Sequence, residues 1–239
     1  MVALVAGGSG GIGEGIVYEL MKAGHTVYVP SREGDQSPRL REYTKDLGTV
    51  HTVEADLENE AEVVSLRDTI LKEAGSIDAV IVSVGAYYYG YSLHRMPHSD
   101  FERSIRDNLF THFTLQRVFA DYMIGRQAGR YITLVGPESE SIIPDEGTMS
   151  IMAASQKMMA RVLAQEASGF GVHVHAITAH TSIRTRSRGS DVNPDWIHAD
   201  DLGQYVRALV EGSLPGSGEV LHELRNRAHV QALLKRVAS

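Results

Sequence analysis

The residues of this chain with the clearest chemical potential form a glycine-rich run near its N-terminus. The run reads Ala6-Gly7-Gly8-Ser9-Gly10-Gly11-Ile12-Gly13 and lies between a short apolar segment and a segment with helical periodicity. Glycines permit a tight turn and a close approach of the backbone to a pyrophosphate, whose negative charge then faces free N–H groups at the helix start. A plain structural turn is the alternative, but this strand–turn–helix context favours a dinucleotide site.

A second position bears on the choice of dinucleotide. The apolar segment 26–30 is followed by Ser31 and Arg32. An acidic residue at this place binds the ribose 2′-hydroxyl of NAD and would repel a 2′-phosphate. A hydroxyl and a guanidinium instead suit a phosphate, so the sequence favours NADP(H) over NAD(H). Glu33 could turn inward and reverse this preference, and a solvated surface arginine is the alternative reading of Arg32.

Short segments rich in Val and Ile are expected to be strands, buried on both faces of a parallel sheet. They are Val2–Ala6, Thr26–Pro30, Val50–Glu54, Ala79–Ser83, Tyr131–Val135, Val172–Thr178 and Glu219–Leu221. Helical patterns lie between and after them, at Ile12–Ala23, Glu58–Ala74, Phe101–Ile124, Met149–Ser168, Ala199–Glu211 and Asn226–Val237. This alternation predicts an α/β fold, a doubly wound parallel sheet of the Rossmann type.

Composition narrows the class of protein. The chain has 239 residues, is 43% hydrophobic and carries a formal charge of −7, so we expect one large core and no electrostatic footprint for nucleic acid or anionic lipid. It contains no cysteine, which fits a reducing compartment. We find no signal peptide and no run of roughly 18 apolar residues. We therefore expect a cytoplasmic protein.

The glycine spacing Gly7-x-x-x-Gly11-x-Gly13 resembles the fingerprint of the short-chain dehydrogenase/reductase family. Asp56-Leu57 resembles the family's adenine-contacting pair, and Asn108 matches its helix asparagine. The segment Ser83-Val84-Gly85 falls where the family has Asn-Ala-Gly, and Thr185 resembles the threonine that meets the nicotinamide carboxamide, with one residue inserted before it. The resemblance implies one NAD(P)-binding domain over residues 1–239, substrate loops at about 86–100 and 180–198, a small-molecule substrate, and a homodimer or homotetramer.

The family's usual catalytic serine, tyrosine and lysine are missing from the matching positions. Aligning the strand 129–136 and the following helix independently places Gly136 at the serine, Met149 at the tyrosine and Ala153 at the lysine. The two alignments agree with the family spacing, and Lys157 is the only lysine in that region. Only Asn108 of the usual four remains, so the ordinary proton relay cannot operate.

Replacement proton donors are few. Tyr88 belongs to a cluster of tyrosines, 87–91, which could present a phenol and flat surfaces to a polycyclic substrate, or could form a lid or a subunit contact. His180 follows Ala179 near the expected nicotinamide and could donate a proton near neutral pH, or could be a hydrogen-bonded structural imidazole. Ser139, Ser141 and Glu138 are weaker candidates. The arginines 184, 186 and 188 could bind an acidic substrate group, or could belong to a solvated loop.

These residues support three functional hypotheses. The first is an atypical NADP(H)-dependent oxidoreductase that reduces a carbonyl or related unsaturated group, because the cofactor carries the hydride chemistry. The second is a cofactor-binding sensor or scaffold without catalysis, with the apolar helix 151–162 as an interface. The third is a cyclase or isomerase that reuses the pocket. No histidine pattern typical of a metal site is present.

Overall fold

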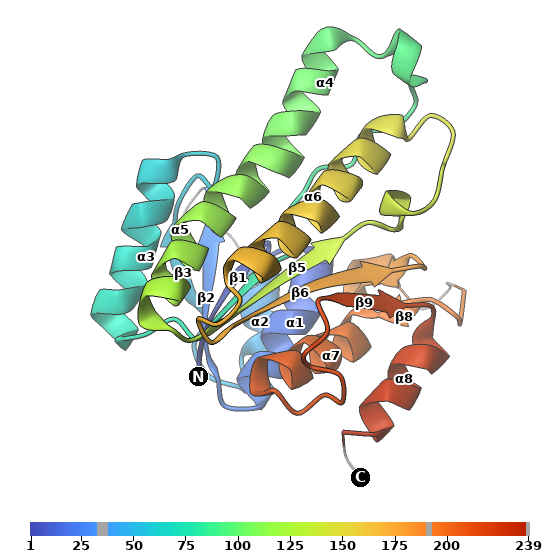
Figure 1. Cartoon of the computed structure of the whole chain (residues 1–239). Coiled ribbons are helices and arrows are strands. Elements are labelled where there is room, and N and C mark those ends of the chain that lie inside the picture. Colours follow the sequence, from blue (N-terminus) through green and yellow to red (C-terminus); the bar gives the residue numbers. More distant parts are fainter. Residues whose placement is uncertain (33–37, 190–192, 238–239) are drawn as a thin grey trace.

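A seven-stranded parallel sheet forms the centre of the protein (Figure 1). The computed structural model describes residues 1–32, 38–189 and 193–237. Along the sheet the strands follow the order β3-β2-β1-β4-β5-β6-β9. Their bounds are β1 Val2–Ala6, β2 Thr26–Ser31, β3 His51–Glu54, β4 Ala79–Val82, β5 Gly129–Val135, β6 Val172–Ala179 and β9 Leu221–Leu224. The order turns back on itself between β1 and β4, which confirms the predicted doubly wound fold.

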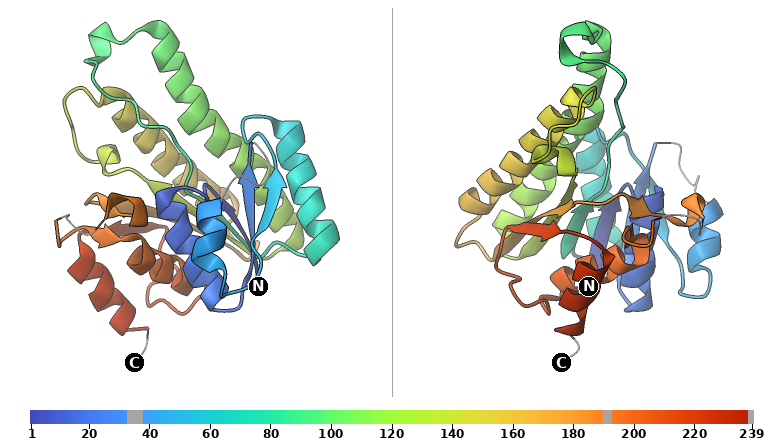
Figure 2. Two further views of the ribbon diagram at one scale, coloured as in Figure 1. Left: turned by 180° about the vertical axis from the view of Figure 1, so that it is seen from behind. Right: turned by 90° about the vertical axis from the view of Figure 1, so that its right-hand side faces the viewer.

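Helices cover both faces of the sheet (Figures 1 and 2). One face carries α1, α2, α7 and α8, and the other carries α3, α5 and α6, with α4 extending α5 beyond the sheet. Their bounds are α1 Gly11–Lys22, α2 Pro38–Thr44, α3 Glu60–Ala74, α4 His98–Ile105, α5 Thr111–Arg126, α6 Gly147–Glu166, α7 Ala199–Glu211 and α8 Arg227–Lys235. In the described ranges, none of the helices has the length and apolarity needed to cross a membrane.

The glycine turn is held in place by close packing between α1 and α7. A Cβ atom added at Gly15 of α1 would lie 2.5 Å from the backbone of Ala199, and one added at Gly203 of α7 would overlap the carbonyl oxygen of Gly15. The two helices can approach this closely only because these residues have no side chains. The start of α1 is therefore fixed against the C-terminal half of the chain.

The structure differs from the sequence prediction in three regions. The expected helix 101–124 is divided into α4 and α5 by a π-helical stretch, Arg106–Phe110, and α5 continues to Arg126. The last strand, expected at 219–221, runs from Leu221 to Leu224, because these residues pair with residues 176–179 of β6. Helix α2 was not predicted, since only Leu40 and Thr44 in it are buried and they leave little apolar periodicity.

The two expected substrate loops are also partly ordered. The loop 86–100 contains a short 3₁₀ helix, Leu93–Arg95, and the start of α4. The loop 180–198 contains two short parallel strands, β7 Ile183–Arg184 and β8 Ile197–His198, which pair with each other outside the main sheet. Strands of two residues lie below the length at which an apolar pattern can be recognised in a sequence.

Two deeply buried histidines are expected to make the fold sensitive to acid. Burial lowers the pKa of His112 and of His175 to about 4. Their neutral forms are bonded, His112 Nε2 to Val84 O at 3.1 Å and His175 Nδ1 to the ring of His222 at 3.0 Å. Since unfolding restores an ordinary pKa near 6.5, the unfolded chain takes up protons first as the pH falls.

The free energy of unfolding should thus have its full value above about pH 7 and should decrease from about pH 6.5 towards pH 4. We expect each of these histidines to lower the free energy of unfolding by about 1.4 kcal/mol when the pH is reduced from 8 to 5.5. Urea unfolding at the two pH values measures this loss. The variant His98→Gln, at an exposed position, is the control and should keep the wild-type difference. Equal unfolding free energies at both pH values would contradict the prediction.

Candidate active site

Two adjoining cavities lie at the C-terminal ends of the strands. The outer cavity has a volume of about 750 Å³ and is lined by the glycine turn, the end of β2 and the segment after β3. The inner cavity has a volume of about 900 Å³ and is lined by residues from α6 and the ends of β5 and β6. Residues 83–86, directly after β4, line both. The site therefore has two compartments on either side of the sheet's switch point, where doubly wound folds bind their ligands.

The structure brings the predicted cofactor residues together around these cavities. The outer cavity is lined by Gly7, Ser9, Gly10, Ser31, Arg32, Asp56 and Leu57. The inner cavity is lined by Gly11, Ile12 and Thr185. The shared wall contains Ser83, Val84 and Gly85. Gly13 alone among the predicted residues lies behind the lining, where it packs under the turn.

The glycine turn is packed too tightly for side chains. Gly7 has φ of +83°, and a Cβ atom there would overlap the carbonyl of Ser83. A Cβ atom at Gly13 would overlap the carbonyl of Gly7. Gly10 caps α1 in an extended conformation and offers no side-chain bond to the first turn. The first N–H groups of α1 thus remain available to an anion such as a diphosphate.

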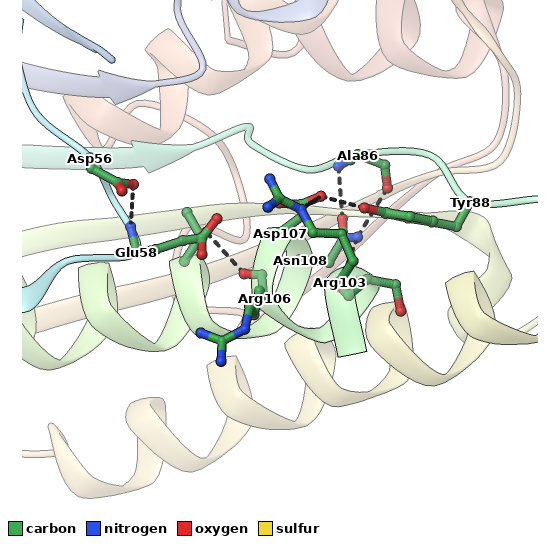
Figure 3. Close-up of polar contacts among 10 residues, drawn as sticks. Asp56, Glu58, Ala86, Tyr88, Arg103, Arg106, Asp107 and Asn108 are labelled. Atoms are coloured by element: carbon green, nitrogen blue, oxygen red, sulfur yellow. Dashed lines mark hydrogen bonds and ion pairs between the residues drawn. The ribbon is translucent and has the colours of Figure 1, made fainter. Parts of the chain in front are cut away.

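The end of β2 contributes a hydroxyl and a positive charge to the outer cavity. Ser31 and Arg32 line it directly, while Glu33 lies outside the described residues. Asp56 is held in place by two bonds: its backbone N–H donates to Glu62 at 2.7 Å, and its carboxylate accepts from the N–H of Glu58 at 3.1 Å (Figure 3). Among the described residues, the carboxylates that line this cavity are those of Asp56, Glu58 and Asp107.

Asn108 connects the π-helical stretch to the wall shared by both cavities. Its side chain accepts from Ala86 N at 3.1 Å and donates to Ala86 O at 3.0 Å (Figure 3). A Cβ atom at Gly85 would lie 2.6 Å from Asn108 Oδ1, so glycine is required there. The backbone carbonyl of Asn108 accepts from Gln156 Nε2 at 2.8 Å. Asn108 therefore positions the segment 84–86 and itself lines the inner cavity.

The three positions aligned with the family's serine, tyrosine and lysine meet at one place. Gly136, Met149 and Ala153 all line the inner cavity. A Cβ atom at Gly136 would overlap the carboxylate of Glu138, so this carboxylate occupies the space where a serine side chain would begin. The inner cavity therefore presents an acceptor there.

The tyrosine cluster divides between two environments. The hydroxyl of Tyr88 donates to the carboxylate of Asp107, which also accepts from Arg103 Nε at 3.1 Å (Figure 3). Tyr88 is not among the residues that line the two cavities. Tyr87 does line the inner cavity, and burial together with its hydrogen bond to Glu146 raises the pKa of Tyr87 to about 12. Each of these two phenols donates to a carboxylate.

His180 lies on the inner cavity and is held by an acidic partner. Its Nε2 lies 2.5 Å from Glu223 Oε2, and the other oxygen of Glu223 lies 2.7 Å from Lys157 Nζ. Sequence reasoning missed Glu223, because the last strand was expected to end at Leu221. The sequence identified Lys157 only as a lysine four residues beyond Ala153, the position aligned with the family's lysine.

The loop after β6 contributes one anchored threonine and one cavity-lining arginine. Thr185 faces the glycine turn, and a Cβ atom at Gly11 would lie 3.0 Å from its Cβ. Arg186 stacks on Tyr43 at 3.6 Å from the ring centroid, whereas Arg188 lines the inner cavity. Of the three arginines that could bind an acidic substrate, Arg188 is therefore the one placed to do so.

Comparison with known proteins agrees with this geometry. A model of the short chain dehydrogenase family matches residues 1–192. A 2-dehydro-3-deoxy-L-rhamnonate dehydrogenase (NAD(+)) from Sphingomonas sp. (strain SKA58) is 25% identical over 179 residues, which cover 75% of this chain and 71% of that protein. A 7alpha-hydroxysteroid dehydrogenase from Escherichia coli (strain K12) is 24% identical over 194 residues, covering 81% and 75%.

Solved structures show the same fold. The structure of ElxO with NADP bound superposes with a TM-score of 0.84 at 15% sequence identity, covering 96% of this chain and 98% of that one. The match to the family model extends over the glycine turn, Asp56, Asn108 and the strand ends that line both cavities. The chain belongs to the short-chain dehydrogenase family of oxidoreductases.

Proposed function

We propose that the protein is an NADP(H)-dependent oxidoreductase that reduces a carbonyl or related unsaturated group of a small or polycyclic substrate without the family's usual serine, tyrosine and lysine. The pair Ser31 and Arg32 on the outer cavity is the observation that carries the choice of cofactor. Gly136, Met149 and Ala153 line the inner cavity, and they are the reason for proposing a reaction without the usual serine, tyrosine and lysine. The family membership and the dehydrogenases among the relatives support a redox reaction.

The residues present fit a nicotinamide dinucleotide. The first N–H groups of α1 would hold the diphosphate, Asp56 and Leu57 the adenine, and Thr185 the carboxamide. When bound, the dinucleotide supplies or accepts a hydride. The relatives do not decide between NAD and NADP, because the name of one specifies NAD(+) and one solved structure holds NADP. Ser31 and Arg32 favour NADP(H), since a 2′-phosphate needs a hydroxyl and a positive charge rather than a carboxylate.

The inner cavity offers apolar walls to the substrate. These walls include Ile143, Met149, Met152 and Ile183, and the cavity's volume of about 900 Å³ would be shared by the substrate and the nicotinamide. Hydride transfer requires a substrate held close to the nicotinamide, and binding in that geometry supplies much of the rate. The remaining requirement is a proton for the product oxygen, which positions 149 and 153 do not supply.

Titration with both reduced nucleotides tests the cofactor assignment. We expect the fluorescence of NADPH to increase when it binds. The affinity for NADPH should be at least 10-fold higher than the affinity for NADH. NADPH oxidation with 1-tetralone, menadione and cyclic imines then tests the reaction. If neither nucleotide binds, the proposal is wrong. If NADPH binds but is never oxidised, the sensor or scaffold hypothesis replaces the reductase.

An exposed apolar surface on α5 and α6 supports self-association. The two helices lie side by side (Figure 1), and Phe113, Met158 and Val162 are 52%, 51% and 44% exposed. We expect a dimer or tetramer by size-exclusion chromatography with light scattering, and dissociation to monomers when Phe113→Glu and Met158→Glu are combined. Ile142→Glu, at a residue that is 97% exposed, is the control. A monomeric wild-type protein would refute this assignment.

A further inference from the structure

Three ionisable side chains from three separate segments meet at the edge of the inner cavity, which His180 lines. His180 follows β6, Glu223 lies in β9, and Lys157 lies on α6. We propose that His180 donates the proton to the substrate oxygen, and that Glu223 and Lys157 are positioning residues that orient it. This inference rests on the proposed reductase function and supplies the donor that the function lacks.

The three side chains form a continuous line of short contacts. His180 Nε2 lies 2.5 Å from Glu223 Oε2, and Glu223 Oε1 lies 2.7 Å from Lys157 Nζ. Lys157 Nζ also donates to Glu140 at 2.8 Å and is only 9% exposed. Residues 178 and 223 are partners in the β6–β9 register, and His180 N donates to Leu224 O at 2.9 Å. The sheet itself therefore fixes the position of the imidazole against the carboxylate.

The charges along the line decide which imidazole nitrogen is free. Burial alone would raise the pKa of Glu223, but hydrogen bonds from Lys157 and His180 and their charges lower it. Burial likewise opposes the charge of Lys157, yet its bonds to Glu140 and Glu223 raise its pKa. Glu223 is thus ionised and only accepts, so His180 Nε2 carries a proton towards it. Nδ1 is the nitrogen that Glu223 does not engage.

Tyr87, Tyr88 and Lys157, which lie near the cavity, already have carboxylate partners. Tyr87 donates to Glu146 and Tyr88 to Asp107. Lys157 lies one helical turn beyond position 153 and is neutralised by two carboxylates. His180 differs from them because one of its two nitrogens has no assigned partner among the described residues. The cavity lining adds Glu138, Glu146 and Arg188 to the charges near it.

The proton balance of the step is complete. As a hydride reaches the carbonyl carbon, the π electron pair of the C=O bond moves to oxygen. That oxygen takes the proton from Nδ1 of the His180 imidazolium and becomes a hydroxyl. The imidazole left behind is neutral and keeps its Nε2–H bond to Glu223. Its side chain is 30% exposed, so solvent can protonate it again.

Kinetics of NADPH oxidation test the donor. With 1-tetralone, or whichever carbonyl of the panel is reduced fastest, His180→Ala should lower kcat by about 10²–10³-fold, with the KM for NADPH unchanged. Free imidazole should restore part of the rate. Glu223→Gln should weaken the reaction about 10-fold and move the alkaline limb of its pH profile to lower pH, and Glu223→Asp should recover the rate. An unchanged rate in His180→Ala, or no effect of imidazole, would overturn the proposal.

The chain offers a matched control pair. His25 Nε2 lies 3.1 Å from Glu211 Oε1, and neither residue lines either cavity. Glu211→Gln therefore neutralises the carboxylate of a comparable histidine–carboxylate pair away from the site. It should leave kcat, KM and the pH profile as in the wild type. If Glu211→Gln and Glu223→Gln have the same effect, the bond at His180 is structural only.

Nuclear magnetic resonance provides a readout that needs no turnover. We expect a slowly exchanging His180 Nε2–H signal in the unliganded protein, which should exchange faster in Glu223→Gln and be unchanged in Glu211→Gln. Adding NADP⁺ with 1-tetralol should shift the Nδ1 resonance of His180. Absence of the Nε2–H signal, or no shift at Nδ1 in a complex that calorimetry shows to be formed, contradicts the relay. Failure of NADPH to bind while the Nε2–H signal is present would instead refute the proposed function.

Discussion

Replacing Gly13 with alanine is expected to lower NADPH affinity by at least about 100-fold. The added Cβ atom would overlap the backbone carbonyl of Gly7 and lie 2.7 Å from Gly8 Cα. These are backbone atoms of the turn itself, so no side-chain rotation can relieve the contact, and overpacking of this kind costs about 1–3 kcal/mol. The turn must shift, and the N–H groups at the start of α1 move away from the diphosphate. Fluorescence titration with NADPH measures the loss.

Gly125→Ala is the matched control for that substitution. Gly125 lies within α5, and nothing stands within 4 Å of a Cβ atom added there. Alanine in a helix interior is favoured over glycine by about 1 kcal/mol, so this variant should melt at the same or a slightly higher temperature and bind NADPH normally. Wild-type affinity in Gly13→Ala would show that the turn does not carry the dinucleotide.

Ser31→Asp is expected to reverse the cofactor preference. The substitution places a carboxylate at the end of β2, where Ser31 lines the outer cavity. A carboxylate there repels a 2′-phosphate and accepts hydrogen bonds from a free ribose 2′-hydroxyl. We expect NADPH binding to weaken about 100-fold, equivalent to about 2.7 kcal/mol, while NADH binding strengthens. Parallel titrations of both nucleotides at one ionic strength measure the change.

Two further variants separate charge from shape at the same place. Ser31→Asn has nearly the size of aspartate without its charge, so it should weaken NADPH far less than Ser31→Asp. Arg32→Leu removes the guanidinium and should weaken NADPH about 10-fold, with little effect on NADH. If Ser31→Asp binds NADPH as tightly as the wild type does, the 2′-phosphate is not recognised at the end of β2, and NADP(H) specificity must be withdrawn.

The parts of the site that depend on local backbone conformation could be predicted from the sequence. The glycine turn follows from neighbouring residues, because tight turns and helix starts are short-range features. The positions of Ser31 and Asp56 beside the outer cavity could be predicted because Ser31 ends β2, Asp56 lies two residues after β3, and parallel strands end at one edge of the sheet. The sixth strand was predicted for the same reason, and with it the approach of His180 to the inner cavity.

Contacts between distant segments could not be predicted in this way. Which tyrosine faces the cavity depends on where the chain after β4 meets α6 and the π-helical stretch, and the structure selects Tyr87 rather than Tyr88. The partner of His180 lies 43 residues further along the chain, and Lys157 is separated from Glu223 by 66 residues. No periodicity or spacing in the sequence encodes such distances.

The sequence by itself determined the doubly wound sheet, the position of the glycine turn and the residue types at the strand ends, because backbone preferences and apolar periodicity act over a few residues. Only the tertiary structure decided which charged side chains meet. It brought Lys157, Glu223 and His180 together through the pairing of β6 with β9 and the packing of α6. Opposite charges far apart in the chain become neighbours only when the sheet has set their register.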